Sequence, residues 1–206
     1  MIRRNGNLIV ISGPSGVGKS TLVKQVREKL PDLQFSISCT TRQPRTGEMG
    51  GREYFFLNEN DFEQKVAAGE FLEYAGIFKH RYGTLKSEVL NRITRGEEVL
   101  LDIDVQGAMQ IRQAAAADPV LAASVQFIMI VPPDLATLEN RLRGRQSETE
   151  EQLSLRLAGA KKELSHFRIY DYLVVNDDLT RAAQELTALL QSMRTRCATI
   201  QGEPFA

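Results

Sequence analysis

The sequence has few cysteines and histidines, no long apolar run and no sign of a signal peptide. Its 206 residues include two cysteines, Cys39 and Cys197, which lie far apart, so we expect no disulfide framework and a reduced, cytoplasmic setting. The cysteines and the two histidines show no metal-ligand spacing. No apolar run approaches the roughly 18 residues that a membrane-spanning helix needs. The opening Met1-Ile2-Arg3-Arg4 does not predict a signal peptide, and we expect no membrane partner.

The sequence also lacks a net charge. Lys and Arg together number 26, and so do Asp and Glu, which gives a formal net charge of zero. Without a global basic field the chain is not suited to coat nucleic acid, and we expect no nucleic-acid partner. The apolar content of 42% and the charged content of 25% are ordinary for a globular protein, and the length suits one α/β core with inserted segments.

Short apolar runs alternate with helical patterns along much of the chain. The run at residues 8–12 predicts a buried parallel strand, and the apolar spacing of residues 19–30 predicts a helix that ends before Pro31. Strands that alternate with helices indicate an α/β fold, in which a mostly parallel sheet is flanked by helices. Further strands are expected at 99–103, 127–131 and 172–175, and further helices at 105–117, 134–144 and 178–195.

Two segments interrupt this alternation. Residues 38–95 contain turn signals and short aromatic runs, which predict an inserted α+β lobe. Residues 132–167 form a second inserted, helical unit. The remaining core consists of residues 1–37, 96–131 and 168–206.

Helix-capping signals occur in both inserted segments. In the first, Asn60 is the expected N-cap, with Glu63 three residues on and Gly69 past the helix end. In the second, Ser147 and Glu150 have the spacing of a capping box.

The strongest motif is a glycine-rich loop between the first predicted strand and helix. Its glycines let successive backbone N–H groups wrap a triphosphate, and the positive helix end adds to the attraction. Lys19 can reach the β- and γ-phosphates, and the Ser20 hydroxyl can ligate Mg²⁺. The reaction stays open, because GTPases, ATPases and small-molecule kinases share this loop. The motif is Gly13-Pro14-Ser15-Gly16-Val17-Gly18-Lys19-Ser20, followed by Thr21.

Several separated motifs, in the same order and over nearly the whole chain, resemble the guanylate kinase family. Members of this family transfer the γ-phosphoryl group of ATP to GMP. The resemblance implies a P-loop NTPase core, a GMP-binding lobe at 38–95, a helical lid at 132–167, Mg²⁺ as cofactor, and dGMP as a further acceptor; it leaves homo-oligomerisation open. The motifs are Ser38-Cys39-Thr40-Thr41-Arg42-Gln43-Pro44-Arg45, Gly51-Arg52-Glu53-Tyr54-Phe55-Phe56, Gly69-Glu70-Phe71-Leu72-Glu73-Tyr74, Leu101-Asp102-Ile103-Asp104-Val105-Gln106-Gly107 and Val174-Val175-Asn176-Asp177-Asp178-Leu179.

The first two of these motifs bear on the acceptor phosphate. Two largely dianionic phosphate groups must approach closely during transfer, and arginine offers forked donors that neutralise and orient them. By the resemblance, Arg42, Arg45, Tyr54 and Tyr82 hold the GMP phosphate.

The third motif bears on the guanine base. Guanine presents two adjacent donors, N1–H and N2–H₂, and the acceptor O6, so a carboxylate matches the donors and a hydroxyl can donate to O6. The resemblance assigns Glu73 as the carboxylate and Ser38 and Thr84 as the hydroxyls. Adenine would leave Glu73 unpaired.

Two aspartates follow the predicted strand at 99–103. Asp102 and Asp104 flank Ile103, so they share one face of an extended chain at the mouth of the sheet. The resemblance assigns Asp102 to ordering the Mg²⁺ water shell or to the acceptor side. Asp104 is expected to assist either, or to cap the next helix.

The lid and the segment after the last strand complete the expected site. By the resemblance, Arg145 and Arg156 reach over the transferring phosphoryl group and Arg141 lies near the adenine, while Arg143 has no assigned role and is solvated. Lys19, Arg42, Asp102, Arg145 and Arg156 are thus the residues expected to act in catalysis. Asn176 borders the adenine; capping of the next helix by Asp177 or Asp178 is the alternative role of this segment.

Three other functions fit parts of the sequence less well. A guanylate-kinase-like module that only binds partners generally has a damaged P-loop, whereas this chain keeps Lys19 and Ser20. A related P-loop kinase with another acceptor is disfavoured by Glu73 together with Arg42 and Arg45. A regulatory GTPase is disfavoured because no Asn-Lys-x-Asp guanine motif is present.

Overall fold

The central sheet has five strands in the order β2-β7-β1-β8-β9, all paired in parallel. The structure, a computed structural model, describes residues 2–77, 79–144 and 149–203. Four of the strands were predicted; β2 was not, because three residues are too few for a periodic signal. The strands are β1 (Leu8–Ser12), β2 (Leu33–Phe35), β7 (Glu98–Asp102), β8 (Val125–Val131) and β9 (Tyr172–Val175).

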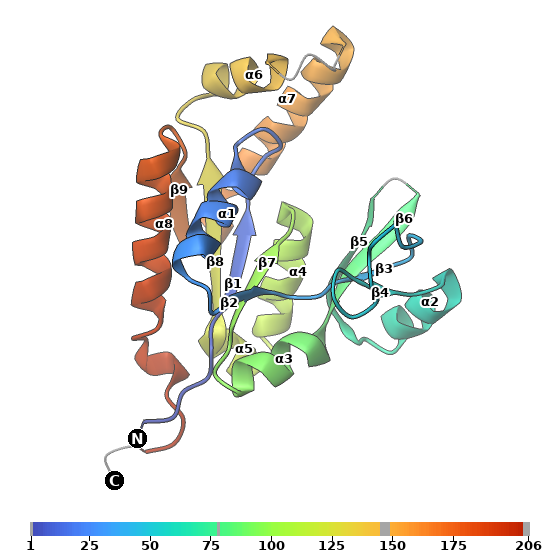
Figure 1. Cartoon of the computed structure of the whole chain (residues 1–206), viewed down its shortest axis with the longest axis vertical. Coiled ribbons are helices and arrows are strands. Elements are labelled where there is room, and N and C mark those ends of the chain that lie inside the picture. Colours follow the sequence, from blue (N-terminus) through green and yellow to red (C-terminus); the bar gives the residue numbers. More distant parts are fainter. Residues whose placement is uncertain (1, 78, 145–148, 204–206) are drawn as a thin grey trace.

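Helices cover both faces of this sheet, as Figure 1 shows, which confirms the predicted α/β class. All five residues of β1 are buried, and alternate side chains enter opposite cores. Ile9 and Ile11 pack towards α1 (Lys19–Lys29) and α8 (Leu179–Met193). Leu8 and Val10 pack on the other side, where the helices are α3 (Lys86–Thr94), α4 (Val105–Ala115) and α5 (Pro119–Ser124).

A second sheet of four strands, β4-β3-β6-β5, lies beside the core (right in Figure 1). Its small core includes Phe62 and Phe71, whose rings stack with centroids 4.6 Å apart, and the fully buried Cys39. Burial raises the pKa of the Cys39 thiol to about 11, so this thiol stays protonated and unreactive at neutral pH. The elements are β3 (Cys39–Thr40), β4 (Phe55–Phe56), α2 (Glu59–Ala67), β5 (Phe71–Ile77) and β6 (His80–Leu85).

The N-cap predicted for α2 was wrong, because the helix begins earlier than the sequence pattern indicated. Asn58, not Asn60, caps the helix: its side chain accepts a hydrogen bond of 2.8 Å from Asp61 N. Asn60 lies inside the first turn, because the helix begins at Glu59. Gly69 follows the helix end with φ of 66°, as expected for a terminating glycine.

Two helices, α6 (Leu135–Arg143) and α7 (Glu150–Leu164), project above the carboxyl end of the sheet (Figure 1). They pack together through Leu138, Leu142 and Leu153. The capping box of α7 is formed by Thr149 and Gln152 instead of the predicted pair, because the helix begins at Glu150; Ser147 lies outside the described residues. The short 3-10 helices are η1 (Phe167–Ile169) and η2 (Cys197–Thr199).

Among the helices of the described residues, none combines the length and the apolar character that crossing a membrane requires.

Candidate active site

The glycine-rich loop joins the carboxyl end of β1 to the first turn of α1, as the motif requires. Gly16 and Gly18 have φ of 87° and 90°, a left-handed region that favours glycine. Packing behind the loop demands glycine as well: a Cβ on Gly16 would lie 2.6 Å from Leu142 Cδ2, and one on Gly18 2.6 Å from Asn176 Nδ2. The loop therefore presents backbone N–H groups without obstruction from side chains.

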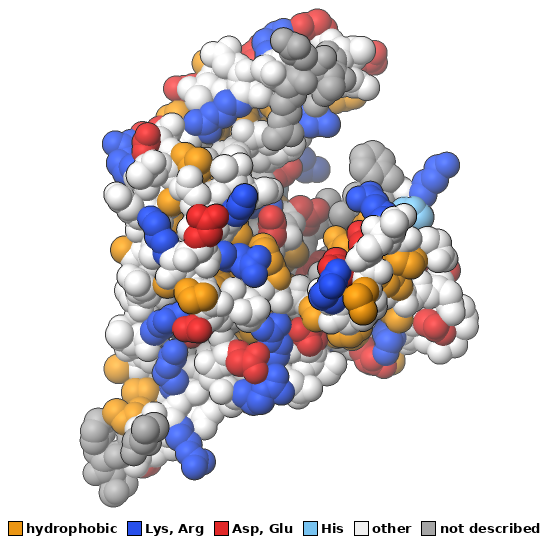
Figure 2. All heavy atoms as spheres, in the orientation of Figure 1, with side chains coloured by type: hydrophobic (Ala, Val, Ile, Leu, Met, Phe, Trp, Pro, Cys, Tyr) orange, Lys and Arg blue, Asp and Glu red, His pale blue; other side chains and the backbone are white. Residues whose placement is uncertain are grey.

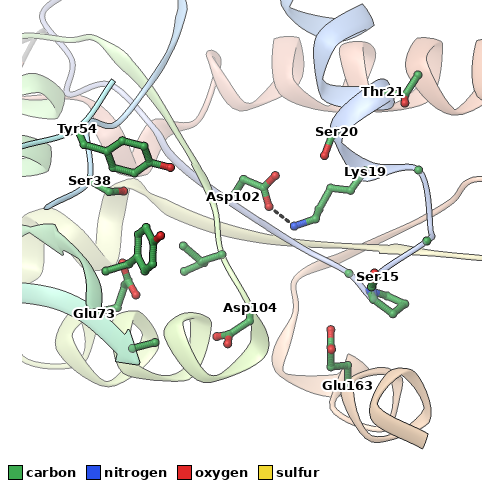
Figure 3. A pocket seen from close by; sticks show the side chains of 17 residues that line it. Ser15, Lys19, Ser20, Thr21, Ser38, Tyr54, Glu73, Asp102, Asp104 and Glu163 are labelled. Carbon is green, nitrogen blue, oxygen red and sulfur yellow. Dashed lines mark hydrogen bonds and ion pairs between the residues drawn. The ribbon is translucent and has the colours of Figure 1, made fainter. Parts of the chain in front are cut away.

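The loop forms one wall of a cavity of about 690 Å³, a size that suits a small-molecule site. Figure 3 shows the opposite wall, which carries Ser38, Tyr54 and Glu73, with Asp102 and Asp104 between the two walls. The space-filling view in Figure 2 shows a hollow between the core and the second sheet. The residues that line the cavity are Gly13, Pro14, Ser15, Gly16, Gly18, Lys19, Ser20, Thr21, Ser38, Tyr54, Glu73, Ala75, Tyr82, Asp102, Ile103, Asp104 and Glu163. The structure thus brings most of the predicted site residues together, from segments far apart in sequence.

Glu73 is a buried carboxylate at the far wall. It lies on β5 opposite Thr84 on β6, and Thr84 Oγ1 donates to Glu73 Oε1 over 2.6 Å. Burial raises the pKa of Glu73, and the charge of Asp104 adds to the rise. A Cβ on Gly107 would lie 3.1 Å from Glu73 Oε2, so helix α4 closes on the carboxylate from the other side. Thr84 itself is fully buried and reaches the cavity only through Glu73.

Two tyrosines and Arg42 lie next to this wall. The rings of Tyr54 and Tyr82 meet edge to face, with centroids 6.0 Å apart, and the Arg42 guanidinium lies 5.4 Å from the Tyr54 centroid. Arg42 Nη2 donates to Glu48 Oε1 over 2.9 Å, a contact that raises the pKa of Arg42 and lowers the pKa of Glu48. Tyr54 and Tyr82 line the cavity, whereas Arg42 lies behind Tyr54 and engages Glu48.

Arg45 is exposed and does not line the cavity. Its backbone N donates to Glu48 Oε2 over 2.8 Å, so the carboxylate that engages Arg42 also fixes the turn that carries Arg45.

Lys19 and Asp102 form an ion pair in the middle of the cavity (Figure 3). Both are partly exposed, because Lys19 begins α1 and Asp102 ends β7 at the same edge of the sheet. Asp104 also faces the cavity, but its Oδ1 accepts a hydrogen bond of 2.9 Å from Gly107 N and caps α4. The helix-capping alternative for Asp104 is therefore confirmed.

Glu163 is a cavity residue that sequence reasoning missed. It comes from the last turn of α7 and lies near Ser15 in Figure 3. Burial raises the pKa of Glu163, and the Asp104 carboxylate adds to the effect. Arg156 lies about two helical turns earlier on the same face, and its Nη1 donates to Ser15 Oγ over 3.4 Å. That spacing from Arg156 is the signal that could have pointed to Glu163.

Three residues predicted to bind ATP, Val17, Arg141 and Asn176, do not line the cavity. The Val17 side chain is fully buried in the core. Asn176 Nδ2 donates to Val17 O over 2.7 Å, and Arg141 Nη1 lies 3.4 Å from the same oxygen. The cap of α8 is Asp178, whose Oδ1 accepts from Arg181 N over 2.8 Å. Asp178 thus caps α8, while Asn176, two residues earlier, contacts the glycine-rich loop.

Arg143 and Arg145 are the remaining arginines of the segment that the resemblance assigns to a lid. Arg143 is exposed and pairs with Glu139 and Glu150, as expected for a residue without a role in the site. Arg145 lies outside the described residues, so its expected position over the phosphoryl group stays a prediction.

A glycine-rich loop at the carboxyl end of a parallel strand, with a second polar wall across a cavity, defines the chain as a P-loop nucleotide-binding protein with room for an acceptor.

Comparisons with known proteins narrow this class. The family described as guanylate kinase matches residues 5–193. A guanylate kinase of Caldanaerobacter subterraneus subsp. tengcongensis is 42% identical over 195 residues, which cover 95% of this chain and 91% of that protein. One of Nitrosospira multiformis is 45% identical over 193 residues, 94% of this chain and 89% of that protein. The crystal structure of guanylate kinase from Anaplasma phagocytophilum superposes with a TM-score of 0.72 at 29% identity, covering 98% of this chain and 93% of that chain.

The chain belongs to the guanylate kinase family. Guanylate kinase activity, a nucleoside monophosphate kinase reaction, is the function that this membership supports.

Proposed function

We propose that the chain transfers the γ-phosphoryl group of ATP to GMP, giving ADP and GDP. The observation that carries the proposal is one cavity with two unlike walls: the phosphate-binding loop on one side and the buried Glu73–Thr84 pair on the other. A donor triphosphate and an acceptor nucleotide can bind there face to face. Family membership supports the same reaction.

Glu73 is proposed to select the guanine base. Its ionised carboxylate accepts from N1–H and N2–H₂, while Thr84 holds Oε1 and Ser38 offers a hydroxyl from the same wall. Tyr54 and Tyr82 bind the acceptor phosphate, and Arg42 adds positive charge beside Tyr54. Arg45 joins them only after the turn at 43–48 moves inward, because its side chain is outside the cavity lining here.

The loop residues from Gly13 to Thr21 are proposed to hold the triphosphate of ATP. Lys19 exchanges its partner Asp102 for the β- and γ-phosphates. The donor set fits Mg²⁺: the Ser20 hydroxyl and the Asp102 carboxylate both line the cavity, and oxygen ligands are those that Mg²⁺ prefers. Bound there with ATP, Mg²⁺ supplies charge neutralisation between the phosphate oxygens. Among the described residues, no cluster of three or more acidic, histidine or cysteine side chains could hold a metal alone, which suits an ion shared with the triphosphate.

The lobe at 38–95 and the lid at 132–167 are proposed to close over the two nucleotides. Arg156, already within reach of Ser15, then approaches the transferring group, together with Arg145. The acceptor oxygen is already ionised, so no general base is needed, and positioning and charge stabilisation carry the reaction. Arg141 remains a proposed neighbour of the adenine, whereas the Asn176 amide is engaged by Val17 O and is not assigned to the base.

A coupled assay of ADP release tests the proposal, with GMP, dGMP, AMP, UMP and CMP as separate acceptors. We expect turnover with GMP and dGMP, and at most trace turnover with the other three. Equal rates with AMP would contradict the guanine assignment. ADP release that is independent of any acceptor would indicate an ATPase instead.

A further inference from the structure

A carbonyl inside the phosphate-binding loop is held from behind by a side chain distant in sequence. Asn176 Nδ2 donates to Val17 O over 2.7 Å. Asn176 is 4% exposed, and its own backbone N donates to Val131 O over 2.8 Å at the end of β8. The amide is therefore anchored to the central sheet through its backbone and to the loop through its side chain.

The loop is shaped to admit this amide. Gly18 has φ of 90°, and a Cβ there would lie 2.6 Å from Asn176 Nδ2, well inside contact distance. Glycine at this position is thus required by the approach of Asn176 as well as by the left-handed backbone.

Holding the Val17 carbonyl also orients the next N–H group. The C=O of Val17 and the N–H of Gly18 belong to one planar trans peptide unit, so they point in opposite directions. Asn176 draws the oxygen to the rear of the loop, which turns the Gly18 N–H towards the front, where Gly18 lines the cavity. Lys19 is the residue after Gly18, so the orientation of the Val17–Gly18 peptide also affects the position of the Lys19 Cα atom, from which its side chain extends.

We propose that Asn176 is a positioning residue for phosphoryl transfer, which holds Val17 O so that the Gly18 N–H and Lys19 face the triphosphate. This role rests on the proposed binding of ATP by the loop, and it differs from a contact with the adenine base. The two roles can be distinguished with a ligand that has phosphates but no base. A positioning residue affects the binding of such a ligand, whereas a residue that contacts only the base does not.

Inorganic tripolyphosphate with Mg²⁺ is such a ligand, and calorimetric titration measures its Kd. We expect Asn176→Ala to raise this Kd about tenfold or more, since Val17 O loses its short 2.7 Å donor and keeps only the 3.4 Å contact from Arg141 Nη1. Asn176→Asp keeps the shape but sets a carboxylate oxygen against the carbonyl, so its Kd rises at least as much. Asn91→Ala, on the exposed side of α3, is the matched control and leaves the Kd unchanged.

The results for the Asn176 variants distinguish a positioning role from a contact with the base. If folded Asn176→Ala and Asn176→Asp bind tripolyphosphate as the unchanged protein does, and only the preference for ATP over other donor triphosphates is lost, Asn176 is a base contact and the positioning role is wrong. Should Asn176→Ala fail to fold, the isosteric Asn176→Asp gives the same answer. If the unchanged protein does not bind tripolyphosphate, or Lys19→Ala binds it equally well, the loop does not hold a triphosphate by itself and the positioning role is wrong, whereas the proposed reaction is decided separately by the ADP-release assay.

Discussion

Thr84 on β6 donates a hydrogen bond of 2.6 Å to Glu73 on the neighbouring strand β5. The bond occupies Oε1 and fixes the plane of a carboxylate that is only 7% exposed. Because the group is buried and already oriented, a base that cannot supply N–H donors leaves a desolvated charge unpaired. Specificity for guanine is therefore expected to depend on this pair more than on any residue of the phosphate-binding loop.

Glu73→Gln should impair selection of GMP. The amide keeps the bond from Thr84 but offers one acceptor oxygen instead of two, so we expect kcat/KM for GMP to fall about 100-fold, with little change in KM for ATP. Steady-state kinetics with GMP and AMP measure the change. Unaltered kinetics with both acceptors would overturn the role given to Glu73.

The pH dependence of GMP binding should show the raised pKa of Glu73. Burial and the nearby Asp104 make the carboxyl take up a proton at higher pH than an exposed glutamate does. The protonated group cannot accept both guanine donors, so KM for GMP should rise as pH falls from neutral, before an ordinary glutamate would titrate. The GMP phosphate also titrates near pH 6.

Glu73→Gln separates these two effects, because it keeps the phosphate titration and removes that of the carboxyl.

Glu73→Gln should also change the thermal stability of the folded protein. A raised pKa in the folded state means that the ionised group opposes folding above that pKa. Glu73→Gln should therefore unfold at a temperature at least as high as the unchanged protein at pH 7, as measured by calorimetry.

Gly107→Ala should disturb the same carboxylate from the side of α4. The added Cβ would lie 3.1 Å from Glu73 Oε2 and 3.2 Å from Ile103 Cδ1, so the carboxylate must shift. We expect a loss of about tenfold in kcat/KM for GMP, a smaller effect than removing the charge. Gly159→Ala is the matched control, since it lies on an exposed position of α7 with open space around it. There, alanine should raise the free energy of unfolding by about 0.5–1 kcal/mol and leave GMP kinetics unchanged.

Lys19→Ala should abolish transfer without unfolding the protein. The ion pair with Asp102 is partly exposed, and such pairs contribute about 0–1 kcal/mol to stability. Loss of the charge that stays with the moving phosphoryl group should lower kcat by about 100-fold or more. Lys24→Ala, exposed on the same helix, should retain full activity. A strongly active Lys19→Ala protein would mean that phosphoryl transfer does not pass over this loop.

Much of the architecture and part of the site could be predicted from the sequence, because they depend on local pattern. Apolar runs and helical spacing placed β1, β7, β8 and β9 and the helices α1, α4, α6 and α8, but not α3 or α5, and the loop motif placed Lys19 and Ser20. The sequence could not place β2 or the cap at Asn58, where three residues or a single side chain decide the outcome.

The glycine-rich loop and the order of its strand and helix were determined by the sequence alone, since each depends on neighbours along the chain. Only the tertiary structure decided that Asn176 lies behind Val17, that Gly107 makes room for Glu73, and that Glu163 enters the cavity. These relationships join residues brought together by the packing of separate elements. Neither periodicity nor a local motif records such contacts, because the free energy that fixes them comes from burial across the fold.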